Sequence, residues 1–391
     1  MADVVIVSAC RTAIGTFGGA LLPFKARDLA SVVMKEALDR IKLSPNMLDD
    51  VIFGACLPRC DELNVTRVAA LKAGIPIEVP AVTVNRVCLS GMATVDMAYN
   101  QIKAERGDIF LCGGTESMST TPYVSFDTRW GARLQNKPLI DSLWQGLHAG
   151  ADIVMGLTAE KLAERHGITR EEQDEVALRS HQNAERAINN GYFKEEVVPI
   201  KIPQRKGEPK IFDTDEHVRI GLTMEKLARL PAAFKEGGTV TAGNASGIND
   251  GAAALVVMSS DKAAELNLEP LAKIADTAIA GVEPDYMGEG PVPATQKLFK
   301  KTKLDVGNID LWEINEAFAT VYINAERQLK FDRSIANVNG SGISLGHPVG
   351  CTGARMIVTM IHELKRRGKK QGITTLCGGG GLGMSTLVEI V

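Results

Sequence analysis

The chain has 391 residues, a formal net charge of −3, 23% charged residues and 45% hydrophobic residues. This balance is typical of a globular protein and argues against a protein that binds nucleic acid or a membrane surface. No run of about 18 apolar residues is present, so the sequence predicts no membrane-spanning segment. The N-terminal residues include no basic region and the seven cysteines form no tight framework, which indicates a reducing cytoplasm.

The first 117 residues alternate β-type and helical patterns. Apolar residues such as Leu29, Val33 and Ile41 recur at helical spacing after Asp28, which we expect to be the N-cap of that helix. This alternation predicts an α/β fold with a largely parallel sheet and helices on both faces. We expect strands at residues 4–8, 51–57, 81–85 and 109–112, and helices at residues 28–41 and 90–105.

The middle of the chain, from about residue 118 to 248, is richer in charged and turn residues. We expect helices at residues 158–166 and 170–190, and an exposed loop at 204–210. The segment ends in a run of small polar residues, 241–251, that includes Ser246. Two interpretations of this run are open, a cradle for a ligand or a long turn that leads into a strand at 254–258.

The last third repeats the pattern of the first. Leu111-Cys-Gly-Gly recurs as Leu376-Cys-Gly-Gly, and each is followed by Met-Ser. Because both motifs follow a strand and helix unit, we interpret them as a duplicated half-domain. We expect strands at residues 309–314, 335–338 and 373–377, and helices at residues 317–329 and 351–367.

Cys88 stands between an apolar strand and a helix that begins near Ser90. A helix N-terminus favours negative charge, so this position predicts a thiol with a lowered pKa, and its amides can hold an oxyanion. A buried core cysteine is the alternative, since cysteines are often buried. Cys56 and Cys60 lie four residues apart, but no second Cys or His pair follows nearby, so no zinc site is expected.

His347 lies in a glycine-rich loop beside Pro348, where an imidazole can take a proton from a thiol. The other five histidines lie in helical or charged contexts expected of surface or structural side chains. Asn315 follows a predicted strand, where it is either a helix N-cap or a site residue. Cys377 ends the last predicted strand and precedes a run of glycines.

Together these residues match a known pattern, because the chain resembles the thiolases, and among them acetyl-CoA acetyltransferases of the biosynthetic type. The resemblance implies two duplicated α/β halves with mixed sheets and helices on both faces, at 1–117 with 249–269 and at 270–391. It also implies an inserted loop domain at 118–248. The motifs that carry it are Asn85-x-x-Cys88-x-Ser-Gly91, Gly113-Gly-x-Glu-Ser-Met-Ser119, Thr241-Ala-Gly-Asn-Ala-Ser-Gly247, Asn315-Glu-Ala-Phe-Ala319, Gly346-His-Pro-x-Gly350 and Cys377-x-Gly-Gly-Gly381.

The resemblance also implies the role of each site residue. Cys88 is the nucleophile that becomes acylated, His347 activates it, and Cys377 exchanges a proton with the α-carbon of acetyl-CoA. Asn315 orders a water at the enolate oxygen, and the Gly379 amide joins that of Cys88 in an oxyanion hole. The residues implied to contact CoA are Arg219, Ser246, Gly247, Phe234 and Met155.

By the same resemblance, acyl-CoA and CoA are the substrates, no cofactor or metal is bound, and the chain forms a homodimer or homotetramer. The expected reaction is reversible condensation of two acetyl-CoA, or thiolysis of a 3-oxoacyl-CoA. A thiolase for longer or unusual acyl chains and a non-catalytic CoA-binding scaffold are the alternatives. Four departures from the family pattern bear on acyl specificity, namely Leu89, Val154, Ser341 and the segment 145–152, and we expect Leu89 and Val154 to lie near the acyl pocket.

Overall fold

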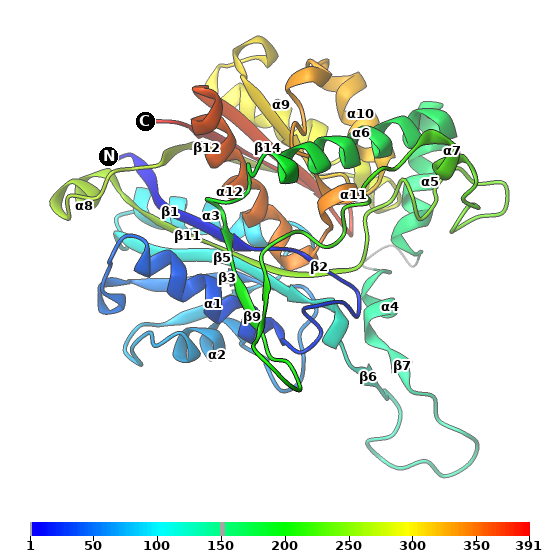
Figure 1. Ribbon diagram of the computed structural model, residues 1–391, viewed down its shortest axis with the longest axis horizontal. Coiled ribbons are helices and arrows are strands. Elements are labelled where there is room, and N and C mark those ends of the chain that lie inside the picture. The colour runs from blue at the N-terminus through cyan, green and yellow to red at the C-terminus, as the bar shows by residue number, and fades with distance from the viewer. Residues whose placement is uncertain (1, 149–152) are drawn as a thin grey trace.

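The computed structural model describes residues 2–148 and 153–391. A mixed sheet of eleven strands runs through these residues, with helices packed around it (Figure 1). The elements of the first part, with the strand that returns after residue 248, are β1 (Val4–Thr12), β2 (Gly15–Thr16), α1 (Ala26–Asp39), β3 (Asp50–Gly54), α2 (Val65–Lys72), β4 (Ala81–Val84), α3 (Ser90–Lys103), β5 (Ile109–Ser117), β11 (Asn249–Ser259) and α8 (Ser260–Glu265).

The remaining elements belong to the C-terminal part and to the segment between the two. The C-terminal elements are β12 (Ala272–Gly281), α9 (Pro291–Thr302), β13 (Leu311–Ile314), α10 (Ala319–Leu329), α11 (Gly342–Leu345), α12 (Val349–Arg367), β14 (Gln371–Gly378) and β15 (Leu382–Glu389). Those between are β6 (Tyr123–Val124), β7 (Ile140–Asp141), α4 (Ser142–Gly146), α5 (Met155–His166), α6 (Arg170–Asn189), β8 (Val197–Val198), β9 (Ile200–Ile202), β10 (Lys210–Phe212) and α7 (Met224–Ala228).

The two halves of the sheet have the same strand order, as the sequence repeat predicts. The first half runs β4-β3-β5-β11-β1, and the second runs β13-β14-β15-β12. A single bridge from Trp312 to Ala336 adds the position that corresponds to β4. The halves join where β1 pairs with β12. The predicted domain boundaries themselves stay a prediction.

The largely parallel sheet expected from the alternating pattern is wrong, whereas the mixed sheet implied by the family resemblance is confirmed. β3 pairs in parallel with β4 and β5, and β13 pairs in parallel with β14, but β1, β11, β12 and β15 make antiparallel pairs. The reason is clearest at β14 and β15, because the short glycine turn between them can join only antiparallel neighbours.

Two local expectations are also wrong. α1 begins at Ala26 with Lys25 as its N-cap, and Asp28 instead accepts from the Lys25 backbone N–H at 2.9 Å as the third helical residue of a capping box. Residues 335–338 do not form a strand, because Asn337 has a φ of 46°. Its side chain bonds the Ile314 N–H and C=O at 2.7 and 2.8 Å in place of a strand partner.

Helices α3 and α12, one from each half, pack against each other inside the molecule. Of the 19 residues of α12, 14 are buried. A Cβ atom on Gly91 would come within 2.9 Å of the Ala354 nitrogen, and one on Gly353 within 2.5 Å of the Met92 nitrogen. The two backbones are therefore in direct contact, and each helix begins just after a predicted catalytic residue.

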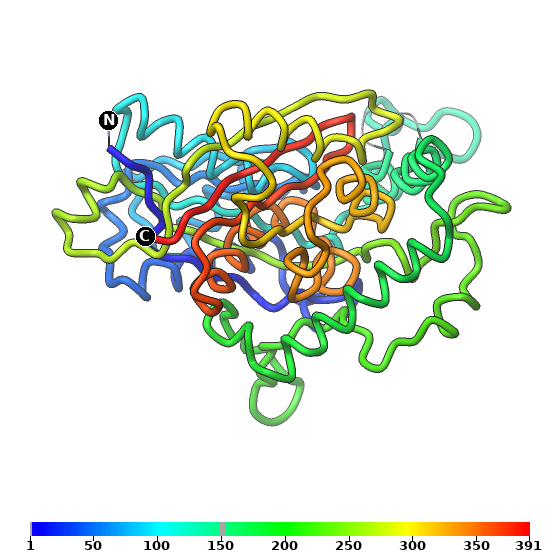
Figure 2. Tube along the Cα trace, turned by 90° about the horizontal axis from the view of Figure 1, so that it is seen from above, coloured from blue at the N-terminus to red at the C-terminus, as the bar shows by residue number. Residues whose placement is uncertain are grey.

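The segment between the halves lies along one side of the molecule, as the green tube in Figure 2 shows. Its β6–β7 hairpin extends away from the sheet (Figure 1). The hairpin exposes large apolar side chains, among them Trp130 at 91% and Leu134 at 85% exposure. Within the described residues, no helix is long and apolar enough to cross a membrane.

Candidate active site

A cavity of about 560 Å³ lies where the two halves meet the middle segment. Apolar side chains such as Leu57, Leu147 and Met287 form much of its wall. Eight of the ten residues expected at the site line it, namely Cys88, His347, Cys377, Arg219, Ser246, Gly247, Phe234 and Met155. Asn315 and Gly379 lie directly behind this wall, the first beside His347 and the second beside Cys88.

The Cys88 turn is strained in a way that presents its side chain to the cavity. Val87, the residue before it, has a φ of 50°, which is unfavourable for a β-branched side chain. The Asn85 side chain accepts from the Val87 N–H at 3.0 Å and donates to the Cys56 carbonyl at 3.1 Å. The Ser90 hydroxyl donates to the Val87 carbonyl at 2.5 Å, so side chains on both sides hold the turn.

The pKa of Cys88 is raised rather than lowered, which corrects the expectation from its place at a helix N-terminus. Loss of hydration raises the pKa to about 11, and the charge of Glu116 adds to the shift. The N–H groups of Gly379 and of Cys88 itself act in the opposite direction but do not outweigh burial. At neutral pH Cys88 is therefore a thiol whose sulfur already faces oxyanion donors.

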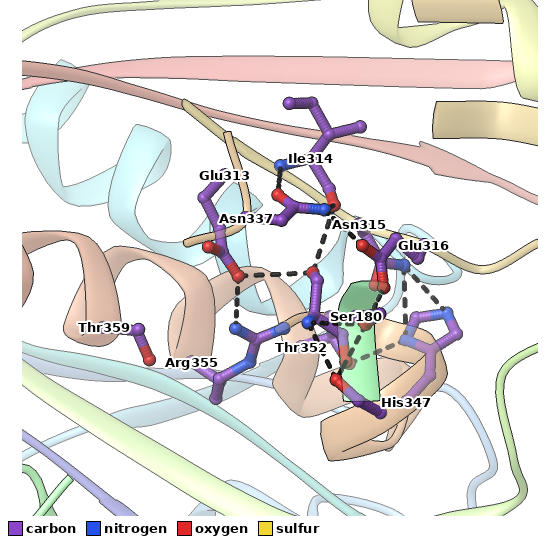
Figure 3. A network of polar contacts seen from close by, with 12 residues as sticks. Ser180, Glu313, Ile314, Asn315, Glu316, Asn337, His347, Thr352, Arg355 and Thr359 are labelled. Carbon is purple, nitrogen blue, oxygen red and sulfur yellow. Dashed lines mark hydrogen bonds and ion pairs between the residues drawn. The ribbon is translucent and has the colours of Figure 1, made fainter. Parts of the chain in front are cut away.

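His347 is held as a neutral imidazole. Burial, with the Arg355 charge as a second cause, lowers its pKa to about 3. Its Nδ1 lies 2.7 Å from the Thr352 hydroxyl, which itself donates to the Pro348 carbonyl at 3.0 Å (Figure 3). Because the Thr352 proton is used there, Nδ1–H is the donor to Thr352, and Nε2 keeps its lone pair. The ring is thus ready to accept a proton at Nε2.

Two further contacts fix the His347 loop and Asn315. The His347 backbone N–H donates to Asn249 at 2.9 Å, and Asn249 donates to the Gly15 carbonyl at 3.0 Å. Asn315 is fully buried, with its amide nitrogen 3.4 Å from His347 Nε2 (Figure 3). Its Oδ1 has no hydrogen-bond partner within the described residues and lies on the side of Gly342, where a Cβ would come within 2.6 Å of it.

Cys377 ends β14, where Gly380 and Gly381 have φ values of 80° and 81°. These left-handed positions let the chain turn sharply into β15 and bring the Gly379 N–H to Cys88. Burial raises the pKa of Cys377, and a negative charge on Cys88 raises it further. The two sulfurs thus influence each other, and Cys377 rests as a thiol.

The residues that depart from the family pattern differ in how close they lie to the cavity. Leu89 is fully buried in the core against Gly378 and does not line the cavity, so its expected place near the acyl pocket is wrong. Val154 does line the cavity. Ser341 is buried and donates to the Ile314 carbonyl at 3.0 Å, just before Asn315. Residues 149–152 of the fourth departure lie outside the described residues.

The residues expected to contact CoA surround the mouth and wall of the cavity. Arg219 is exposed and donates to the Ala242 carbonyl at 3.1 Å, and the Ser246 N–H donates to Ala317 at 3.0 Å. Phe234 meets Phe318 edge to face, with ring centroids 6.2 Å apart. Much of the 241–251 run lines the cavity, and its last residues begin β11, so the run is both part of the cavity wall and a turn into a strand. Its contact with a ligand stays a prediction.

Sequence reasoning missed two side chains of the cavity wall. His217 lines it, with burial lowering its pKa to about 4, although the sequence suggested only a surface or structural role. Cys56 also lines it. Within the described residues, no group of three or more His, Cys, Asp or Glu side chains could hold a metal. The sequence around Cys56 and around His217 contains no motif that predicts a place in the cavity, because only the fold brings residues 56 and 217 together.

Comparison with known proteins agrees with this geometry. Residues 4–261 match the N-terminal domain of the thiolases and residues 268–390 match their C-terminal domain. The chain belongs to the thiolase family. It is 48% identical to an acetyl-CoA acetyltransferase of Cupriavidus necator, with all of both chains covered. These matches confirm the predicted family and enzyme class.

Solved structures of relatives have the same fold. A Bacillus anthracis acetyl-CoA acetyltransferase is 49% identical with a TM-score of 0.98, covering 100% of this chain and 99% of its own. A human mitochondrial 3-ketoacyl-CoA thiolase, solved in complex with CoA, is 42% identical with a TM-score of 0.95, covering 100% of this chain and 98% of its own. The thiolase fold is thereby confirmed.

The raised pKa of Cys88 predicts its reactivity in this thiolase. Because the thiolate is the reactive form, alkylation of Cys88 by iodoacetamide should accelerate by ~10-fold per pH unit between about pH 7 and about pH 10. Peptide mass mapping measures Cys88 separately, and the exposed Cys60 in the same sample controls for reagent decay. A rate that levels off near pH 8 would contradict the raised pKa.

Proposed function

We propose that this thiolase interconverts acetyl-CoA and a 3-oxoacyl-CoA, with acetoacetyl-CoA as the principal 3-oxoacyl substrate, through an acyl group on Cys88. The observation that carries the proposal is the convergence of three groups on one cavity: the thiols of Cys88 and Cys377 and the neutral imidazole of His347. Transfer of an acyl group between thiols needs a nucleophile, a base for it and a second proton carrier.

In the thiolysis direction, His347 Nε2 takes the Cys88 proton as the sulfur attacks the 3-oxo carbon. The amides of Cys88 and Gly379 stabilise the oxyanion. The bond between C2 and C3 then breaks, and the departing acetyl-CoA enolate receives a proton from Cys377. The raised pKa of Cys377 keeps that proton in place until this step.

The second half-reaction returns both protons. A CoA thiol attacks the acyl group on Cys88 and gives its proton to the Cys377 thiolate, while the leaving Cys88 sulfur recovers its proton from His347. Asn315, whose amide nitrogen lies 3.4 Å from His347 Nε2, orders a water at the enolate oxygen. In the condensation direction the same steps run backwards, and Cys377 removes the α-proton of acetyl-CoA.

Arg219, Ser246 and Gly247 contact the CoA portion of the substrate, and Phe234 and Met155 contact its pantetheine arm. Their places on one cavity wall support this assignment. The human thiolase solved with CoA has the same fold and supports it as well. The apolar side chains that form much of the cavity wall suit an acyl chain and the uncharged arm of CoA.

Substitutions of the two cysteines should separate the two half-reactions. Cys88→Ser should abolish both the acyl adduct and thiolysis, because an alcohol is a far weaker nucleophile. Cys377→Ala should still acquire an acyl group on Cys88 from acetyl-CoA but lose condensation by at least ~10²-fold, as expected for a missing general base. Intact-mass and peptide analysis after incubation with acetyl-CoA measures the adduct.

The opposite pattern would contradict the assigned roles. An acyl adduct on Cys377 in preference to Cys88 would mean that Cys377 is the nucleophile. Equal loss of acylation and condensation in Cys377→Ala would show that the two cysteines do not have separate roles. A wild-type chain that binds CoA but never becomes acylated would be the non-catalytic scaffold that the sequence left open.

A thiolase for longer 3-oxoacyl-CoA is the second candidate, because Val154 gives the cavity an apolar wall where acetoacetyl enzymes carry a histidine. Val154→His should shift preference toward acetoacetyl-CoA by roughly 10- to 200-fold, the range that small pocket changes produce. Thiolysis of 3-oxoacyl-CoA substrates of increasing chain length measures this. A wild-type preference for acetoacetyl-CoA already larger than that range would exclude the second candidate.

We also propose that the chain is a homodimer or homotetramer in the cytoplasm. The edge strand β4 ends the sheet, and apolar side chains near it are exposed, including Leu63 at 80% and Ile77 at 73%. An unpaired apolar edge of this kind favours pairing with a second copy. The exposed apolar β6–β7 hairpin offers a second contact, which favours a dimer of dimers.

Light scattering at low micromolar protein should therefore give a mass of at least twice 41.9 kDa. A charge on the edge, as in Val82→Lys, should weaken the dimer, because Val82 is 38% exposed on β4. The same charge introduced at Val391, 76% exposed at the chain end, is the control. A stable, fully active monomer would overturn the proposed assembly.

A further inference from the structure

Glu116 is a buried carboxylate that none of the steps above uses. It lies on β5 and is 1% exposed. Its Oε2 accepts the N–H groups of Cys56 at 2.8 Å and Gly350 at 2.9 Å, and its Oε1 accepts that of Leu57 at 3.2 Å. No Lys, Arg or His of the described residues forms an ion pair with it. Burial raises the pKa of Glu116 to about 7, and the three converging N–H donors act in the opposite direction and favour the carboxylate.

The three donors belong to two segments that contact the nucleophile and its base: Cys56 and Leu57 follow β3 beside the Cys88 turn, and Gly350 lies at the start of α12 after His347. On one side, the Cys56 thiol lies 2.7 Å from the carbonyl of Val87, the strained residue before Cys88. On the other side, Gly350 is the second residue of α12, three positions after His347. A Cβ on Gly350 would lie 2.7 Å from both the Ala55 Cα and Glu116 Oε2, so the two elements and the carboxylate are in close contact.

We propose that Glu116 is a positioning residue that fixes the Cys88 turn and the His347 loop relative to each other, so that Nε2 can take the thiol proton as Cys88 attacks. This inference rests on the proposed function. It assigns Glu116 a geometric rather than an electrostatic role, because the charge of Glu116 raises the pKa of Cys88 and therefore opposes thiolate formation.

The geometry makes Glu116→Gln an informative change. A carboxylate accepts at both oxygens, whereas the amide of Gln turns an NH₂ group toward at least one of the three N–H donors. Repulsion there should separate the Cys56–Leu57 segment from the start of α12. Because a misplacement of about 1 Å can cost ~10²-fold in rate, we expect the acylation of Cys88 by acetyl-CoA to fall by ~30-fold or more.

Two measurements distinguish positioning from a general structural role. Alkylation of Cys88 by iodoacetamide at high pH needs a thiolate but no base, so in Glu116→Gln it should stay within ~3-fold of wild type or increase. In a His347→Ala background, Glu116→Gln should lower acylation by less than ~3-fold, because the imidazole that Glu116 aligns is already absent. If Glu116→Gln instead collapsed the cavity, both the alkylation and the acylation of Cys88 would be slower, with His347 present and with His347→Ala.

Glu62→Gln is the matched control, since Glu62 is also a buried carboxylate, 3% exposed, but does not line the cavity. Its acylation rate should match wild type. The proposal would be overturned if Glu116→Gln were acylated within ~3-fold of the wild-type rate. It would also be overturned if Glu116→Gln lowered acylation as much in the His347→Ala background as in the wild-type background.

If Glu116→Gln does not fold, Glu116→Asp takes its place with the same expectations, because its shorter carboxylate cannot reach all three donors. A wild-type chain without a Cys88 adduct would instead refute the proposed function.

Discussion

The site depends on the contact between two helix backbones. Gly91 on α3 and Gly353 on α12 leave no room for a side chain between the helices, so their separation is fixed by the main chain and not by adjustable side chains. Cys88 lies two residues before the start of α3, and His347 lies two residues before the start of α12. Because close-packed interiors transmit small shifts, any change in this contact moves the nucleophile relative to its base. The Cys56 and Gly350 bonds to Glu116 reinforce the same contact at its cavity end.

The site at rest avoids charge on the groups that react. Burial raises the pKa of Cys88 to about 11 and lowers that of His347 to about 3, so a thiolate–imidazolium pair is unfavourable until substrate arrives. The developing negative charge then moves onto an oxyanion that faces backbone amides, which are already in position. This arrangement limits reaction of the sulfur with other electrophiles, and it explains why a helix N-terminus, which by itself would favour the thiolate, is outweighed here.

Local patterns in the sequence predicted what is local in the structure. Cys88, His347 and Cys377 each follow or precede a glycine-rich turn, and the structure brings all three to one cavity. The wrong predictions concern residues whose position is set by tertiary contacts. Leu89 was expected near the pocket as a departure from the family pattern, yet as the N-cap of α3 it packs into the core against Gly378. Residues 335–338 have strand-forming side chains, but the Asn337 side chain takes over the hydrogen bonds of a strand. His217 reaches the cavity only because the middle segment folds back over it.

The duplication shows how one motif can acquire two uses. β5 and β14 occupy the same place in their half-sheets, and each contains Leu-Cys-Gly. In the first half, Cys112 is fully buried in the core and β5 continues through Thr115 and Glu116 in pairing with β11. In the second half, β14 ends at Gly378, one residue after Cys377, and the left-handed Gly380 and Gly381 turn the chain into β15. That early turn places the sulfur at the cavity and frees the Gly379 amide, while the longer continuation of β5 beyond its cysteine supplies the carboxylate of Glu116. The different extension of two equivalent strands beyond their cysteines therefore places a proton carrier on one side of the site and a structural anchor on the other.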